Sequence, residues 1–395
     1  MDGIFVFDMS NDLVFQNTNE LMKEKLLSIA EKMGVVAPDS TTAALTSDSL
    51  IHIFNPLLAN LRFMLIQFDN SFNFVKCQHG FNMVFDEFFG YMFITVSDDK
   101  PIEFMQRSQG VFIAFLRFIF GPAIFQLKAD NKKSEMLANI FTKWKKLYEE
   151  NQDVCLDVIE QLTVNNDVKK SIVAALELAL ENLKQDPQFQ RNHAVVFVEN
   201  KLLSVFSMRT SQHLTPADIH FLNIFCQTVE VTHKIETYML FLRGTNNSCI
   251  PHKVHRIAVT PLITLLLLSE FGNTIISSNL YEVFVQLNKI KVLQSQVDMD
   301  NLVIETDKLD KVVKTVIDIE KKLKNNDHED SVKNFQNKYE SLKKKYVEML
   351  KIMDKNQLVR VESYFPYFLE AARDLYRVRK RNSDSKSRII LVFSF

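Results

Sequence analysis

Histidines and acids at short spacings are the first candidates for metal chemistry in this sequence. His252 and His255 lie three residues apart, and Asp327-His328-Glu329-Asp330 forms a dense polar run. A zinc site needs further ligands at matched spacings, and no acid neighbours the histidine pair. The acidic run lacks the glycine and the terminal glutamate of a calcium loop. We therefore interpret the pair as strand-edge residues and the run as a solvated turn, and we expect no metal ion.

The cysteines and one further pair of acids are the other candidates for catalysis. Asp157 and Glu160 would share one face of a helix, but no histidine or cysteine at ligand spacing accompanies them, so we interpret them as solvent-facing. No GxSxG nucleophile motif occurs. The cysteines form no CxxC pair and are interpreted as free thiols in a reducing compartment: Cys77, Cys155, Cys226 and Cys249.

Glycine is scarce and phenylalanine abundant. The chain has 8 glycines and 33 phenylalanines among 395 residues, whereas an average chain of this length would carry about 28 glycines. Loops that cradle a phosphate need clustered glycines, and neither GxGxxG nor GxxxxGK[ST] occurs. The shortage of glycine argues against enzymes that hold a phosphate in such a loop. Because acid–base clusters are missing too, we expect no catalytic residue and no bound cofactor, and an unrecognised enzyme is the least favoured of the hypotheses.

The charge balance argues against nucleic-acid binding. Lys and Arg total 47 and Asp and Glu total 48, which gives a formal net charge of −1. Trp144, between Lys143 and Lys145, could stack on a base, but we favour a tryptophan that anchors its helix. The basic segment from Arg377 to Arg388 would suit an anionic lipid or a partner, and a solubilising linker explains it equally well.

Two apolar runs are too short to cross a membrane. They cover Val111 to Phe120 and Ile257 to Leu268, and a spanning helix needs about 20 apolar residues. The N-terminus lacks the basic start of a signal peptide. We therefore expect a soluble, cytoplasmic protein.

The helices and strands that the sequence predicts follow an order that occurs twice. The first round has a hairpin at 4–15, helices at 20–33 and 51–65, strands at 72–78, 81–85 and 91–96, and helices at 101–120, 133–150 and 154–183. The second has a hairpin at 194–207, a capped helix from Thr215 to about 231, strands at 238–242, 255–259 and 262–268, and a helix at 280–293. Beyond residue 302, two charged amphipathic segments predict a helical hairpin, which serves as a spacer, a partner surface or a support for its own protein.

The order of two strands, a helix, three strands and closing helices is that of a longin domain. The segment from Asn192 to Phe206, followed by Leu214-Thr215-Pro216-Ala217-Asp218, resembles the start of a second longin domain in the Hermansky–Pudlak syndrome type 1 family. Four more segments are similar to that family: 72–96, 154–180 with Trp144 before it, 263–268, and 280–293. The family also has a third, C-terminal longin domain, and this chain is expected to end before one is complete.

This resemblance implies an α+β protein with two longin-like domains followed by a helical hairpin. The expected division is a first longin-like domain at 1–130, a helical connector at 131–190 and a second longin-like domain at 191–295. The hairpin follows at 296–360, and 361–395 forms a tail or the start of an incomplete third domain.

The resemblance also implies a function by contact. Members of the family pair with a second longin-containing Hermansky–Pudlak subunit in the biogenesis of lysosome-related organelles complex three. That complex is a guanine-nucleotide exchange factor for Rab GTPases serving organelles such as pigment granules. The chain would be cytoplasmic and reach endosomal or lysosome-related membranes transiently through its partners. The alternative is a longin-type trafficking adaptor or tether without exchange activity.

The expected mechanism places the partner surface on the first domain. The two subunits would grip the Rab GTPase together and displace the segments that hold Mg²⁺ and nucleotide. On the helix at 51–65 and the strands at 81–96, the residues proposed for this surface are Ile51, Phe54, Leu58, Phe81, Phe85 and Tyr91.

Overall fold

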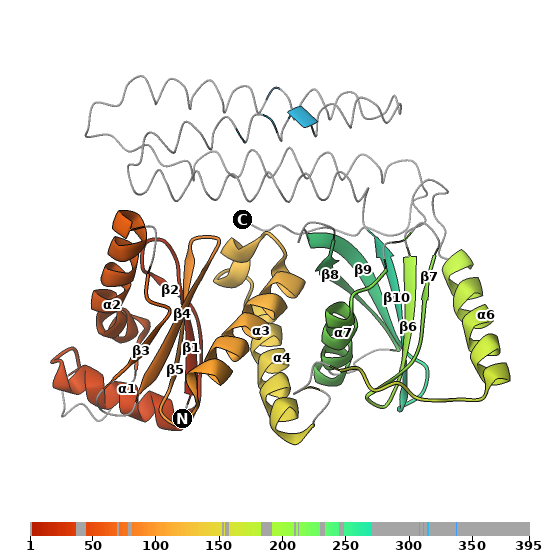
Figure 1. Cartoon of the computed structure of the whole chain (residues 1–395), viewed down its shortest axis with the longest axis horizontal. Coiled ribbons are helices and arrows are strands. Elements are labelled where there is room, and N and C mark those ends of the chain that lie inside the picture. Colours follow the sequence, from red (N-terminus) through yellow and green to blue (C-terminus); the bar gives the residue numbers. More distant parts are fainter. Residues whose placement is uncertain are drawn as a thin grey trace. The chain divides into compact units, whose positions relative to one another are not determined.

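The computed structural model describes two compact units, one ending at Asp157 and the other beginning at Val158. The described residues are 2–36, 45–68, 71–77, 81–151, 158–182, 192–208, 213–229, 234–244 and 249–270, with a few isolated positions besides. The predicted helix at 280–293, most of the predicted hairpin and the C-terminal tail lie outside these residues. Each unit is an antiparallel sheet with helices on its faces (Figure 1).

The sheet of the first unit has the order β2-β1-β5-β4-β3. Its strands are β1 (Asp2–Phe7), β2 (Leu13–Thr18), β3 (Phe74–Lys76), β4 (Asn82–Phe88) and β5 (Tyr91–Ser97). The predicted turn between β4 and β5 is confirmed, with Phe89 and Gly90 both at positive φ, 53° and 78°. Two successive residues at positive φ match the twist of a tight hairpin. Glycine adopts a positive φ freely, whereas phenylalanine does so only under strain.

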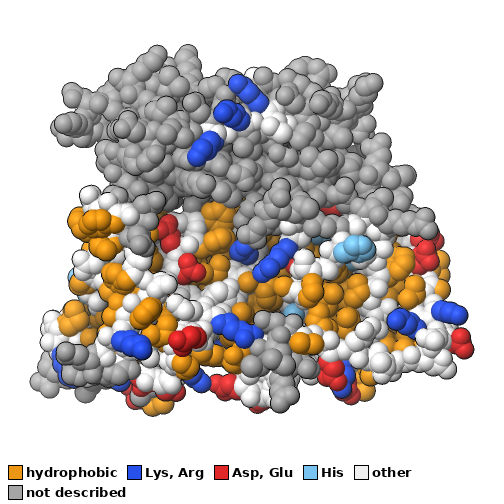
Figure 2. Space-filling model, in the orientation of Figure 1, with side chains coloured by type: hydrophobic (Ala, Val, Ile, Leu, Met, Phe, Trp, Pro, Cys, Tyr) orange, Lys and Arg blue, Asp and Glu red, His pale blue; other side chains and the backbone are white. Residues whose placement is uncertain are grey.

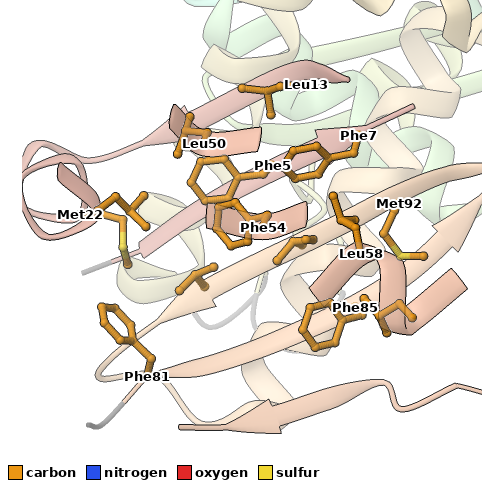
Figure 3. Packing of buried hydrophobic residues seen from close by; sticks show 14 residues of the cluster. Phe5, Phe7, Leu13, Met22, Leu50, Phe54, Leu58, Phe81, Phe85 and Met92 are labelled. Atoms are coloured by element: carbon orange, nitrogen blue, oxygen red, sulfur yellow. The ribbon is translucent and has the colours of Figure 1, made fainter. Parts of the chain in front are cut away.

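Helices α1 (Glu20–Lys32) and α2 (Ser47–Phe68) cover one face of this sheet. The core between them consists of side chains that alternate along the strands, and Figure 3 shows Phe5 and Phe7 of β1 against Phe54 of α2. The Thr46 hydroxyl accepts a hydrogen bond from the Ser49 amide and so caps α2.

The opposite face of the sheet is covered by α3 (Ile102–Phe120), which packs on α4 (Asn131–Glu150). Phe112 of α3 contacts Phe93 on the sheet and Phe141 of α4, and Phe141 stacks on Trp144 with ring planes 11° apart. Trp144 is 2% exposed. It therefore anchors its helix, as we favoured, and presents no ring face to a nucleic-acid base.

The sheet of the second unit repeats this topology, with the order β7-β6-β10-β9-β8. Its strands are β6 (Asn192–Val198), β7 (Lys201–Ser207), β8 (Ile235–Arg243), β9 (Cys249–Ala258) and β10 (Ile263–Glu270). Helices α6 (Asn166–Asn182) and α7 (Pro216–Thr228) lie on opposite sides of the sheet (Figure 1). The recurrence of element order that the sequence predicts is thus a recurrence of sheet topology.

Buried charges fix both ends of α7. At the N-terminus, the Asp218 carboxylate accepts hydrogen bonds from the Thr215 amide and hydroxyl and from the Arg243 amide. At the C-terminus, the Arg256 guanidinium donates to the carbonyl oxygens of Cys226 and Val229. A negative group at the start and a positive group at the end both favour the helix dipole.

Residues 158–165 differ from the sequence prediction. We expected one helix over 154–183, but α6 begins at Asn166, and Gln161 instead forms a parallel bridge with Leu202 of β7. The apolar stripe of α6, with Leu176 and Leu180, packs on β6. The structure thus assigns the two helices of the expected connector to different units, because α4 packs on α3 and α6 packs on the second sheet.

Candidate partner surface

The inner face of α2 holds most of the residues predicted to contact a partner. Phe54 and Leu58 are 2% and 0% exposed, and they pack against Phe81 and Phe85 of the sheet region, which are also buried. These four side chains, which we predicted for the partner surface, form part of the core of the first unit. The apolar periodicity that identified α2 marks its packed face, and only one face of a helix can pack on the sheet.

The other two predicted residues remain partly accessible. Ile51 lies on the first turns of α2 and packs at the edge of the core, and Tyr91 opens β5. Neither is fully buried. Of the six residues predicted for the partner surface, these two are therefore the ones that solvent reaches in the folded unit.

The outer side of α2 carries almost no charge. Between Ser49 and Phe68 the helix has a single charged side chain, Arg62. The exposed positions of this stretch are His52, Asn55, Pro56, Ala59, Asn60, Phe63, Gln67 and Phe68. Solvent-facing helix surfaces are normally rich in charge, whereas the centres of protein interfaces are depleted of it.

Arg62 does not restore charge to this surface, because its guanidinium is turned toward the sheet. Its Nε donates to Asn11 Oδ1 at 2.8 Å, and its Nη2 donates to the Asp8 carbonyl oxygen at 2.5 Å. Glu87 of β4 lies near enough to interact, and there burial raises the pKa of the carboxyl while Arg62 opposes the rise. The cation thus ties α2 to the β1–β2 turn.

Exposed aromatic rings lie at the C-terminal end of α2. Phe63 and Phe68 are 56% and 64% exposed and meet edge to face with centroids 6.4 Å apart. Phe74 of the edge strand β3 is also 45% exposed, but it pairs with Val84 on the opposite face of the sheet, which α3 covers. Figure 2 shows hydrophobic side chains along α2 on this side of the first unit. We call the uncharged outer residues of α2, together with Phe63 and Phe68, the α2 surface.

Helix α1 in the same unit shows what an ordinary solvent face looks like. Its exposed positions include Glu20, Glu24 and Lys32, and Lys23 forms an ion pair with Glu20 at 2.7 Å. The contrast between the two helices is a property of their sequences, since both cover the same face of one sheet. In its low charge and its exposed aromatic rings, the α2 surface resembles a protein interface more than a solvent-facing helix surface.

The second unit contains a hydrogen-bonded serine and histidine, which raises the question of nucleophilic catalysis. Nδ1 of His193 lies 2.8 Å from Ser207 Oγ. However, burial, with smaller effects of His252 and His213, lowers the pKa of His193 to about 3. A general base works best with a pKa near the working pH. This imidazole is therefore a buried structural partner of the serine.

The histidine pair His252 and His255 does not converge on a common point. Residues three apart on a strand lie on opposite faces of the sheet. His252 is 4% exposed and donates from Nδ1 to the Ile250 carbonyl oxygen, and Nδ1 of His255 lies 2.9 Å from Thr237 Oγ1. Within the part of the chain that the structure describes, no three His, Cys, Asp or Glu side chains gather as a metal site would require.

Two units with the same antiparallel sheet order and flanking helices define a protein built from two longin domains. The first longin domain of FUZ, MON1 and HPS1 matches residues 2–150, and the second longin domain of the same proteins matches residues 189–287. The chain therefore belongs to the FUZ, MON1 and HPS1 family, whose longin domains are trafficking-related. No curated protein sequence matches the chain. The predicted α+β fold with two longin domains is confirmed.

Sequence reasoning missed Phe63, Phe68 and Phe74 as surface residues. The signal that identifies the α2 surface was present, because nineteen residues after Ser49 contain one charge in a chain with 24% charged residues. Apolar spacing alone directs attention to the inner face. In the part of the chain that the structure describes, none of the helices combines the length and the hydropathy of a membrane span.

Proposed function

We propose that this protein is a subunit of a guanine-nucleotide exchange factor for a Rab GTPase, and that it acts by contact through the α2 surface. The finer assignment is to the Hermansky–Pudlak syndrome type 1 branch of the family, working with a second longin-containing subunit on lysosome-related organelles. The chain would be cytoplasmic and be recruited to these membranes peripherally. It would be a regulatory subunit without covalent chemistry.

The observation that carries this proposal is the uncharged, aromatic outer side of α2. Interfaces gain most of their binding energy from a few large side chains surrounded by contacts that exclude water. Phe63 and Phe68 are exposed rings of this kind, and Asn55 and Asn60 lie beside them without charge. A partner surface speeds nucleotide release only if it binds the open, nucleotide-releasing form of the GTPase more tightly than the closed, nucleotide-bound form.

A second candidate function has the same observation behind it. A longin-type adaptor or tether would also need an uncharged docking surface, and it would bind its partners without changing nucleotide release. The two functions differ in one measurable property, the rate at which a bound Rab loses its nucleotide.

The deciding experiment combines copurification with nucleotide release. The chain is expressed with the second subunit, and release of a fluorescent guanine nucleotide is followed for a panel of Rab GTPases. We expect acceleration of at least about tenfold for one Rab, a modest part of what contact catalysis can supply. An intact complex that leaves every Rab at its intrinsic rate would refute exchange and favour the adaptor.

Variants on α2 test whether that surface is the one in use. Asn60→Lys places a charge at the centre of the surface, and Phe63→Ser removes a ring that is 56% exposed. Leu21→Ser on α1 is the matched control, since Leu21 is 57% exposed in the same unit. We expect the α2 variants to lose partner binding or exchange by about tenfold and the control to retain both. Equal behaviour of all three would exclude the α2 surface.

A further inference from the structure

We infer that the turn between β9 and β10 is a membrane-contacting tip that inserts aliphatic side chains among lipid acyl chains. The tip consists of Ile235 at the start of β8 together with Val259 and Leu262 in the turn. Their side chains are 59%, 51% and 58% exposed, which is far above the exposure of the other aliphatic residues of these strands. This inference concerns the second unit and does not rest on the proposed exchange activity.

The three residues are neighbours in space. The Ala258 amide donates to the Lys234 carbonyl oxygen at 3.0 Å, which holds the start of β8 against the end of β9. The Val259 amide donates to the Ile263 carbonyl oxygen, also at 3.0 Å, which closes the turn. Each of the three tip residues either forms one of these bonds or adjoins a residue that does. The tip residues therefore form one patch at the end of the sheet.

The turn is held rigidly although it is exposed. Oγ1 of Thr260 accepts hydrogen bonds from the amides of Leu262 and Ile263, and Pro261 restricts the backbone between them. The Leu262 carbonyl oxygen accepts a hydrogen bond from the Glu199 amide of the neighbouring β6–β7 turn. A rigid turn loses little conformational entropy when its side chains enter another phase.

The chemistry of the tip favours lipid over a protein partner. Protein interfaces depend on Trp, Tyr and Arg anchors that fill pockets, whereas the exposed apolar residues of this tip are all aliphatic. Burial of aliphatic side chains is favourable in any apolar medium and needs no shape match. Val259 and Leu262 lie beyond the ends of β9 and β10, on the turn that joins these two strands.

The charges around the tip do not oppose this contact and do not direct it to anionic lipid. Lys234 and Glu199 are exposed on either side, and Lys201 is paired with Glu160. These four groups sum to no net charge. The tip should therefore bind vesicles of neutral phosphatidylcholine, which separates it from any electrostatic contact made by the basic segment at 377–388.

Flotation of the full chain with phosphatidylcholine vesicles tests the tip directly. The variant Ile235→Thr/Val259→Thr/Leu262→Ser should lower the partition coefficient at least about tenfold. Val168→Thr/Leu178→Ser on α6 is the matched control, because its residues are 49% and 59% exposed in the same unit. We expect the control variant to float like the unmodified chain. Equal flotation of the chain and the tip variant, whether both bind or neither binds, would overturn the inference.

A second measurement does not depend on the triple variant. Leu262→Trp places a fluorophore at the tip, and lipids brominated on their acyl chains quench only a tryptophan that touches them. Trp144 is 2% exposed and stays outside their reach. We expect quenching in Leu262→Trp that is absent from the unmodified chain. No quenching, or loss of a protein partner by the tip variant while flotation persists, would assign the tip to another role.

Discussion

Acid should destabilise the second unit through two buried histidines. His193 of β6 and His252 of β9 have ring centroids 5.9 Å apart and are 3% and 4% exposed. Burial lowers the pKa of His193 to about 3, with His252 and His213 adding to the effect, and burial lowers the pKa of His252 to about 4. Both imidazoles are therefore neutral in the folded protein, while in the unfolded chain each binds a proton near pH 6.5.

The direction of the effect follows from these values. A base whose pKa is lower in the folded state stabilises the fold fully above its unfolded pKa. That stabilisation is lost as the pH falls below about 6.5 toward the folded values. Between about pH 7.5 and about pH 5, each histidine should lower the free energy of unfolding by about 2 kcal/mol, and the pair by about 4 kcal/mol.

The assay is urea unfolding at both pH values, followed by circular dichroism and by tryptophan fluorescence. Trp144 is the single tryptophan and lies in the first unit, so fluorescence identifies that unit's transition. The transition seen by circular dichroism alone belongs to the second unit. Its midpoint is the one expected to fall steeply with acid.

The matched variant replaces both rings by asparagine, His193→Asn/His252→Asn. Each amide can occupy the place of Nδ1, which lies 2.8 Å from Ser207 Oγ in His193 and 2.9 Å from the Ile250 carbonyl oxygen in His252. The variant should start less stable at neutral pH but lose about 4 kcal/mol less on acidification. The same acid loss in the variant and the unmodified chain would refute the assignment of two buried neutral histidines.

Two further predictions concern the charges that fix α7. Asp218→Ala should lower the free energy of unfolding of the second unit by about 3 kcal/mol, because a carboxylate with three hydrogen bonds is lost. Asp130→Ala, which removes one bond to the Lys133 amide, should cost about 1 kcal/mol, and equal losses would contradict the argument. Arg256→Met should lower the free energy of unfolding by about 3–5 kcal/mol, because Glu236 stays buried without the cation that lies 3.4 Å away. A urea midpoint close to that of the unmodified chain would show that the ion pair is dispensable.

The local elements were predictable because their signals are local. Thr215, Pro216 and Asp218 specify a helix start through bonds within one turn, and the structure contains that capping box. Gly90 permits the positive φ that the β4–β5 turn needs. Such features depend on a few adjacent residues, so the order of elements, and with it the longin fold, follows from the sequence.

The failed predictions concern choices that depend on distant residues. The helix expected over 154–183 starts only at Asn166, because Gln161 pairs with Leu202 of β7 some forty positions further along. Phe54 and Leu58, two of the residues predicted for the partner surface, pack in the core with Phe81 and Phe85, which belong to the same prediction. Spacing identifies an apolar stripe but does not state whether the protein itself or a partner covers it.

The sequence by itself determined two repeats of one element order, the absence of phosphate-binding loops, and a helix at α2 nearly devoid of charge. The tertiary structure alone decided which face of α2 the sheet covers and where Arg62 turns its charge. It also decided that His193 and His252, 59 positions apart in the chain, share one buried site. The reason is physical: backbone preference acts over a few residues, whereas burial, and the pKa values and exposed surfaces that depend on it, is set by segments that meet only when the chain has folded.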